Sequence, residues 1–276
     1  MSKPNPNRTA KVTPIIDVAD PKYQVSKEHA PDKTDTWPMP MEKDGWIMAH
    51  DTLRYEMKLI LEALEAVASR AAKDTDTDSN GWIVEYIQSI WKIHEDHVHD
   101  HHHNEDGVLV PVLKTKFHWP EKLEADHKEL EAIMTKLNGC IMGMKPTSLD
   151  GLGEIIKLWK EYQVMMKPHL LEEEQTTLPL LRAYFEPKEI IPVTQKIVQS
   201  APKTLLGACI NTLGGKEEFS EFMKQEKIPG FVWYIEFGPA YRNYLKVFVA
   251  KIDALKSGTK IEEPAKTLLQ KIFCCL

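Results

Sequence analysis

The stretch HHHNE at residues 101–105, followed by Pro111, and the stretch HLLEE at residues 169–173, followed by Pro179, repeat one pattern. In both copies a glutamate follows a histidine by four residues, and a proline follows that glutamate by six. Because an α-helix turns once every 3.6 residues or so, the histidine and the glutamate of each copy share one helix face. Two such faces turned toward each other bring together two imidazoles and two carboxylates, which suit a first-row metal such as iron or manganese. The repeat therefore predicts a metal site between two helices.

Both copies lie within long segments of helical periodicity. Apolar residues recur at helical spacing in four segments, residues 46–68, 83–112, 123–141 and 155–180. Short polar or glycine-containing stretches connect them, and short connections favour antiparallel neighbours. The sequence predicts an all-α fold: an antiparallel up-down-up-down four-helix bundle with additional C-terminal helices.

The composition changes on either side of these segments. Residues 1–44 hold seven of the 18 prolines and show little periodicity, so we expect an extended or partly disordered N-terminal tail. Residues 45–185 form the expected bundle. Residues 186–276 contain shorter apolar helical segments, which predict a C-terminal accessory helical region packed on the bundle.

Each of the four long segments carries a histidine at an inward position of its apolar stripe. These histidines are His50, His101, His127 and His169, and the repeated pattern adds Glu105 and Glu173. Burying two carboxylates without a cation would cost several kcal/mol each, and a bound metal removes that cost. The set of six predicts one metal site in the interior of the bundle.

The order and spacing of these residues resemble the hemerythrin-like HHE cation-binding family over roughly residues 45–185. In that family a four-helix bundle holds a non-haem diiron centre, with His on helix 1, HxxxE on helix 2, His on helix 3 and HxxxE on helix 4. The resemblance implies two iron ions bridged by Glu105 and Glu173, with His50, His101, His127 and His169 completing the ligand set.

Two departures from the oxygen-carrying hemerythrins bear on function. Those proteins have HxxxH on the third helix, whereas Leu123 and Glu131 lie four residues on either side of His127. They also end in HxxxxD, where this chain has Glu174. With one histidine fewer, the chain resembles the sensor and enzyme-like branch of the family, and a reversible oxygen carrier is not favoured.

Six histidines between residues 94 and 103 leave the register open. On a helix they point in all directions, so we expect at most two or three to face inward and His99 and His103 to be exposed. His102 with Asp106 repeats the spacing of four, but only His101 with Glu105 matches the distance to the following proline. His97, one turn before His101, could supply a fifth histidine.

Other metal sites fit the sequence less well. A ferritin-like site needs Glu-x-x-His on two helices, and Glu124 with His127 is the single occurrence. A zinc hydrolase of the HExxH type has no matching motif.

The function of the site stays open between three alternatives. A binding or sensing protein would take oxygen, nitric oxide or iron at the diiron centre. A diiron enzyme would act on peroxide, oxygen or a small substrate, and an iron storage or detoxification protein would use the histidine-rich segment. We favour binding or sensing, with a small diatomic ligand or iron as the partner.

Charge and composition bear on the partners of the chain and on its location in the cell. The net charge of −6 and the pI near 6.0 argue against nucleic acid as a partner, and no apolar run approaches the ~20 residues of a transmembrane helix. The four cysteines show no disulfide or CxxC spacing, so we expect a cytoplasmic protein. The terminal Cys274 and Cys275 could be lipidated, although a frayed tail is the simpler interpretation.

Overall fold

The computed structural model describes residues 7–32, 37–71, 81–146 and 148–262, so Cys274 and Cys275 lie outside the described residues. Within these ranges the regular structure is helical, and the single β-type contact is an isolated bridge between Gln24 and Phe117. The prediction of an all-α fold is confirmed. Among the described residues, no helix combines the length and the apolar character needed to cross a membrane.

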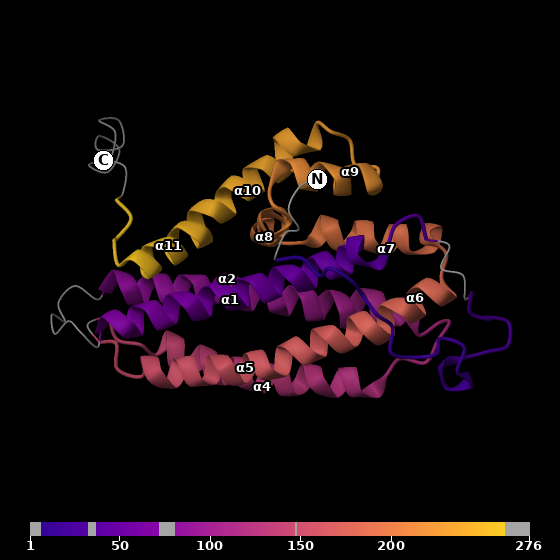
Figure 1. The fold of residues 1–276 in the computed structure, drawn as a ribbon, viewed down its shortest axis with the longest axis horizontal. Helices are drawn as coiled ribbons and strands as arrows, with labels where there is room; N and C mark the ends of the chain where they lie inside the picture. Colours follow the sequence, from indigo (N-terminus) through magenta and orange to yellow (C-terminus); the bar gives the residue numbers. More distant parts are fainter. Residues whose placement is uncertain (1–6, 33–36, 72–80, 147, 263–276) are drawn as a thin grey trace, which may run out of the picture.

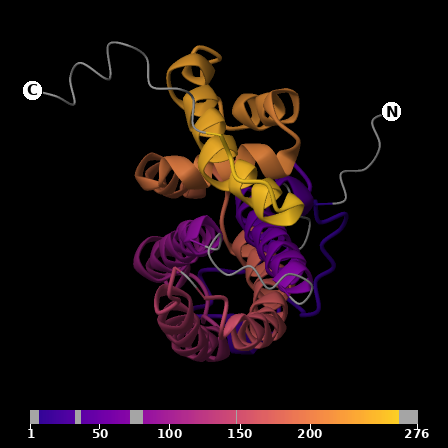
Figure 2. The ribbon, with the colours of Figure 1, turned by 90° about the vertical axis from the view of Figure 1, so that its left-hand side faces the viewer.

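Four long helices lie side by side. They are α1 (Gly45–Ala71), α2 (Gly81–Asn104), α4 (Glu121–Met142) and α5 (Leu152–Glu172). Helix α1 packs against α2 and α5, and α4 also packs against α2 and α5, so that each helix has two neighbours in the group (Figures 1 and 2). The four apolar stripes of the sequence meet in the space that the helices enclose.

The prolines of the repeated pattern reshape two of these helices. Helix α2 continues through a π-helical turn, Glu105–Leu109, into α3 (Val110–Leu113), and α5 continues through Glu173–Thr177 into α6 (Leu178–Tyr184). Since proline has no N–H group, Pro111 and Pro179 cannot make the ordinary i→i−4 bond. The N–H of the residue before each proline bonds instead to the carbonyl five residues back, which belongs to Glu105 or Glu173. Both glutamates thus begin widened turns, which are frequent at functional sites.

The residues predicted as metal ligands lie between two apolar cores. One core extends along α1, α2, α4 and α5 and includes Trp91 and Trp159, whose side chains are fully buried. The other includes Leu113, Phe117 and Leu180. His127 lies between Leu123 of the second core and Leu130 of the first, which encloses the centre on both sides.

Shorter helices form a layer on the outer side of α1 and α2. They are α7 (Pro187–Ser200), α8 (Lys203–Leu213), α9 (Lys216–Gln225), α10 (Gly238–Tyr244) and α11 (Ala250–Ser257). Helix α8 packs on α1, and α11 packs on α1 and α2 (Figure 1). Helices α8 and α10 approach so closely at Gly207 that a Cβ atom there would lie 2.5 Å from the carbonyl oxygen of Ala240. A glycine is required at this crossing.

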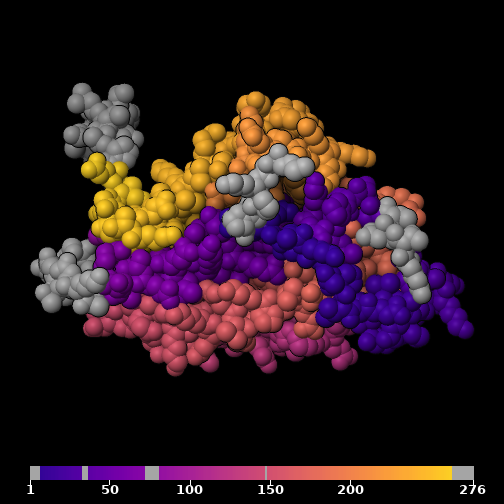
Figure 3. Space-filling model, viewed as in Figure 1, coloured from indigo at the N-terminus to yellow at the C-terminus, as the bar shows by residue number. Residues whose placement is uncertain are grey.

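The N-terminal segment lies against the bundle in extended form (Figure 3). Val12 is buried with Ile47 and Leu178. The hydroxyl of Thr9 donates a hydrogen bond of 2.6 Å to Asp51, the residue after His50, and its backbone N–H donates one of 3.0 Å. The segment therefore covers the part of α1 that carries His50.

Candidate metal centre

All six residues predicted as ligands are buried and lie close together. Two groups of potential metal donors form, each with its donor atoms within 4.8 Å of one another. The first group contains His50, His101, Glu105 and Glu173, and the second contains His102, His127 and His169. Helices α1, α2, α4 and α5 each contribute, together with the two π-helical turns.

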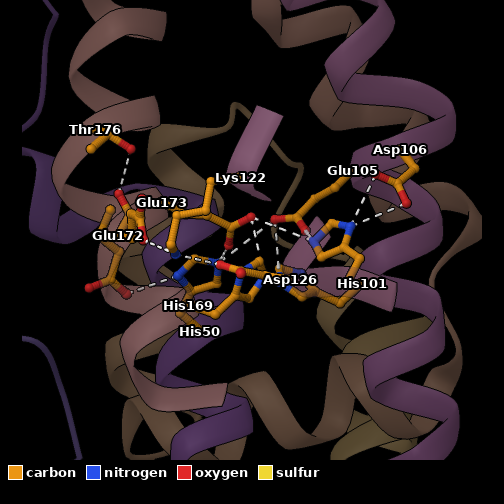
Figure 4. Close-up of polar contacts among 12 residues, drawn as sticks. His50, His101, Glu105, Asp106, Lys122, Asp126, His169, Glu172, Glu173 and Thr176 are labelled. Atoms are coloured by element: carbon orange, nitrogen blue, oxygen red, sulfur yellow. Dashed lines mark hydrogen bonds and ion pairs between the residues drawn. The ribbon is translucent and has the colours of Figure 1, made fainter. Parts of the chain in front are cut away.

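The two carboxylates lie within 4 Å of imidazoles from both groups. Figure 4 shows Glu105 and Glu173 beside His50, His101 and His169. One oxygen of Glu105 is 3.3 Å from Nε2 of His101 and 3.8 Å from Nε2 of His50, and its other oxygen is 3.6 Å from Nε2 of His127. Glu173 is placed in the same way. Its Oε2 is 3.4 Å from Nε2 of His50, and its Oε1 is 3.5 Å from Nε2 of His169. Each carboxylate therefore offers one oxygen to each group.

Most of these donor atoms make no hydrogen bond within the described part of the chain. Nε2 of each of the five histidines, Oε2 of Glu105 and both carboxylate oxygens of Glu173 are buried, and none has a hydrogen-bond partner there. A buried polar atom without a partner costs about 1–3 kcal/mol, so this concentration would be strongly unfavourable without a ligand. Imidazole and carboxylate donors suit iron or manganese, and the residues present fit such a metal.

A second layer of side chains orients the first. Nδ1 of His50 lies 2.9 Å from Glu174, and Nδ1 of His127 lies 3.2 Å from Asp106. A carboxylate only accepts hydrogen bonds, so it holds a proton on Nδ1, and Nε2 is the nitrogen left to bind a metal. The indole N–H of Trp46 donates a bond of 2.7 Å to Glu105. Sequence analysis missed Glu174, Asp106 and Trp46 in these roles.

The comparison with protein families agrees with this geometry. The hemerythrin HHE cation-binding domain matches residues 44–181, which is half of the 276-residue chain. The chain belongs to this family. A comparison with curated proteins and one with solved structures each found no significant match.

The electrostatics of this hemerythrin HHE domain divide its histidines into two kinds. Burial lowers the pKa of His50 and of His127, but the neighbouring carboxylates outweigh burial and raise each pKa to about 9. Burial and the nearby imidazoles hold the pKa values of His101 and His102 well below the ordinary range, and the pKa of His169 falls to about 4. Without metal, His50 and His127 therefore hold protons that a bound cation would have to displace.

His102 is the main addition to the predicted set. Its ring stacks on that of His127 with 4.2 Å between centroids, and it belongs to the second donor group. His101 and His102, which are adjacent on α2, face different donor groups. The dipeptide His101-His102 was the available clue. Asp106, the partner in the alternative register, instead bonds His127.

The remaining histidines of α2 fall outside the centre. His99 and His103 are exposed, as predicted. His97 is buried but lies 2.9 Å from Glu56, and it belongs to neither donor group. Four of the six histidines are buried rather than two or three. The expected number was too low because His97 bonds Glu56 of α1 and its ring lies 6.4 Å from that of Tyr244 of α10.

Proposed function

We propose that this chain is a non-haem diiron protein that binds or senses a small ligand at its iron centre. The ligands are the six predicted residues, His50, His101, Glu105, His127, His169 and Glu173, together with His102. Bound iron would supply reversible one-electron chemistry and a site for a diatomic molecule. The antiparallel up-down-up-down order of α1, α2, α4 and α5 is part of this proposal, and the ring of helix contacts supports it.

One observation carries the proposal. Each glutamate directs one oxygen toward each imidazole group. Oε2 of Glu105 and both oxygens of Glu173 have no hydrogen-bond partner among the described residues, so they are available to a metal. A single ion would need one compact donor set. Two donor groups with shared carboxylates favour two ions with bridging glutamates.

The two ions would be unequal. The first group supplies two imidazoles, and the second supplies three because His102 joins His127 and His169. His102 thus takes the place of the second histidine that helix 3 lacks, next to His127. The ion between His50 and His101 would have one imidazole fewer, so it is the better place for an added ligand.

Burial of the centre favours a small ligand. All seven residues expose less than a tenth of their surface, and an apolar core lies on each side. A bulky substrate could not reach the ions without a rearrangement of the helices. Oxygen, nitric oxide or iron itself therefore fits better than a large organic molecule. The alternative that burial still allows is an enzyme that acts on peroxide or oxygen, or a protein that stores iron.

We further propose three parts for the chain: an N-terminal segment over residues 1–44, the hemerythrin-like bundle over 45–185 and the accessory helices over 186–276. A cytoplasmic location is also part of the proposal. The thiols of Cys140 and Cys209 are free, which suits a reducing compartment.

The metal content of the purified full chain tests the proposal. We expect about two irons per chain after anaerobic loading and gel filtration, and one zinc or none would contradict it. His102→Ala should lower the iron content toward one per chain, while the exposed neighbour, changed in His103→Ala, should retain both. Exposure of the reduced protein to oxygen or nitric oxide then separates the alternatives. A reversible spectral change supports binding, and many turnovers of peroxide support an enzyme.

A further inference from the structure

A second buried polar cluster lies in the bundle apart from the metal centre. We call it the Glu56 network, and it consists of Glu56, His94, His97, Tyr162 and Tyr244, each fully buried. These residues come from α1, α2, α5 and α10, so the network joins the bundle to the accessory helices. None of them belongs to the two donor groups of the metal centre.

Hydrogen bonds within the network saturate the carboxylate of Glu56. Oε2 lies 2.9 Å from Nδ1 of His94, and Oε1 lies 2.9 Å from Nδ1 of His97. The hydroxyl of Tyr244 donates to Oε1 over 3.0 Å. Burial raises the pKa of Glu56, but the two imidazoles outweigh it and lower that pKa to about 2. Glu56 is therefore a carboxylate that accepts three hydrogen bonds.

This arrangement fixes the direction of the bond between His94 and Tyr162. Because Glu56 only accepts, the neutral imidazole of His94 carries its proton on Nδ1 and presents a lone pair at Nε2. The hydroxyl of Tyr162, 3.0 Å from that nitrogen, must be the donor. Hydroxyl, imidazole and carboxylate then follow one another in the order that lets the imidazole take the hydroxyl proton.

Acid–base chemistry on a substrate does not explain this triad. Every member is fully buried, and burial together with the charge of Glu56 raises the pKa of Tyr162 far above its ordinary value. The phenol keeps its proton under ordinary conditions. Loss of an electron changes this, because an oxidised phenol is a strong acid. A base already in hydrogen-bond contact is what makes such an oxidation favourable and reversible.

The triad also has a defined relation to the metal centre. Tyr162 precedes His169 by seven residues on α5, and His94 precedes His101 by seven on α2. Seven residues are two helical turns, about 10 Å along each axis, so both residues lie on the same helix faces as metal ligands. Met166 and Val98, which lie between them in sequence, are buried and apolar.

Further oxidisable rings adjoin the triad. The ring of Trp159 lies 5.4 Å from those of Tyr162 and His94, and the ring of Trp91 lies 5.8 Å from that of Trp159. Both indoles are fully buried. Tyr162 would be oxidised by the metal centre before Trp159, since Trp159 lies almost one turn further from His169 along α5.

We propose that Tyr162 is a redox-active residue that gives one electron to the iron centre when hydrogen peroxide reacts there, while its phenolic proton moves to Nε2 of His94. The proposal rests on the proposed diiron site. Peroxide is the oxidant: it accepts one electron from a ferrous ion and one from Tyr162, takes two protons from solvent, and yields two waters. At the triad the O–H bond of Tyr162 breaks and an N–H bond forms at His94, beside the negative charge of Glu56.

Rapid freezing followed by electron paramagnetic resonance tests this step. The iron-loaded full chain is mixed with hydrogen peroxide, and its iron content and circular dichroism are measured beforehand. We expect a tyrosyl radical whose spectrum changes when ring-deuterated tyrosine is incorporated. Tyr162→Phe should reduce the signal at least tenfold. Tyr244→Phe is the matched control, since it removes a buried phenol on Glu56 but leaves the triad intact, and it should retain the signal.

A second variant tests the proton acceptor. Glu56→Gln can present an amide N–H to Nδ1 of His94, which moves the imidazole proton to Nε2 and removes the acceptor that faces Tyr162. The radical yield should fall although Tyr162 is present. A radical that persists in Tyr162→Phe, or none in iron-loaded wild type, overturns the proposal. Wild type that binds no iron overturns the diiron function itself, so the two failures are distinguishable.

Discussion

The metal centre and the Glu56 network are built from the same kinds of side chain in the same bundle, but only in the Glu56 network is the carboxylate saturated with hydrogen bonds, and there a single imidazole nitrogen, Nε2 of His97, has no partner among the described residues. In the Glu56 network each carboxylate oxygen accepts a hydrogen bond from an imidazole. In the metal centre the Nε2 atoms and the oxygens of Glu173 converge, and none has a hydrogen-bond partner among the described residues. Buried imidazole and carboxylate are therefore not enough to indicate a metal. The diagnostic feature is that several atoms able to bind a metal face one another and have no hydrogen-bond partners among the described residues.

The largest expected effect is the loss of iron when one of the two glutamates proposed to bridge the ions is removed. Glu173→Ala should reduce bound iron from about two per chain to nearly none, because both ions lose a ligand and a negative charge. The control is Glu56→Ala, which removes an equally buried glutamate and should leave the iron content unchanged. Metal analysis after gel filtration measures both variants. Equal iron loss in the two would remove the distinction between the clusters.

The same two variants should rank in the opposite order when the free energy of unfolding is measured, with the larger loss in Glu56→Ala. Without metal, Glu56→Ala leaves two imidazoles and a tyrosine hydroxyl without their acceptor, and a broken buried pair costs about 3–5 kcal/mol. Glu173→Ala should cost the metal-free protein less, since Glu173 and Glu105 repel each other and Glu173 lacks hydrogen bonds. Urea unfolding of the metal-free variants gives both values. A larger loss of unfolding free energy in Glu173→Ala would show that the metal-free centre is also stabilised by its own polar contacts.

Iron binding at the metal centre should release protons and should therefore depend on pH. The pKa values of His50 and His127 are raised from 6.5 to about 9 without metal, so both imidazoles are protonated at pH 7.5 and must lose their protons to iron. We expect about two protons released per chain and an affinity that rises with pH up to about 9. Calorimetry in buffers of different ionisation enthalpy measures the proton number. A value near zero would contradict the raised pKa values.

A rise in pH should have the opposite effect on the stability of the metal-free fold. A histidine whose folded pKa lies above its unfolded pKa stabilises the fold below the unfolded value and loses that contribution as pH rises through the folded value. The metal-free protein should therefore become less stable between pH 6.5 and 9. The iron-loaded protein, whose histidines carry no such protons, should not show this decline in thermal unfolding.

The smallest effect should come from the second layer. Trp46→Phe removes the indole N–H that donates to Glu105 but keeps an aromatic ring beside His50. Changes to such supporting groups typically weaken metal affinity by about 10–100-fold. Competition with a chelator measures this loss, and iron content at saturation should stay near two. An unchanged affinity would show that this hydrogen bond does not position Glu105.

Much of the fold follows from local sequence patterns. The four long helices follow apolar periodicity, and the repeated proline behind Glu105 and Glu173 corresponds to the two π-helical turns. The six predicted ligands come together because each interrupts an apolar stripe. These are local regularities, and a single sequence displays them directly.

The additional polar contacts depend on distant parts of the chain. Tyr244 reaches Glu56 from a helix 188 residues further along. His102 and His97 required knowledge of what packs on each side of α2, and Glu174 could not be distinguished in sequence from the neighbouring Glu172 and Glu173. Periodicity identifies which residues are buried, but it does not identify which buried groups face one another.

An anomalous difference map at the iron absorption edge, from crystals of the iron-loaded chain, tests the central claim most directly. We predict two peaks, one beside His50 and His101 and one beside His102, His127 and His169, with Glu105 and Glu173 between them. A single peak, or a peak at Glu56 among His94 and His97, would contradict the account.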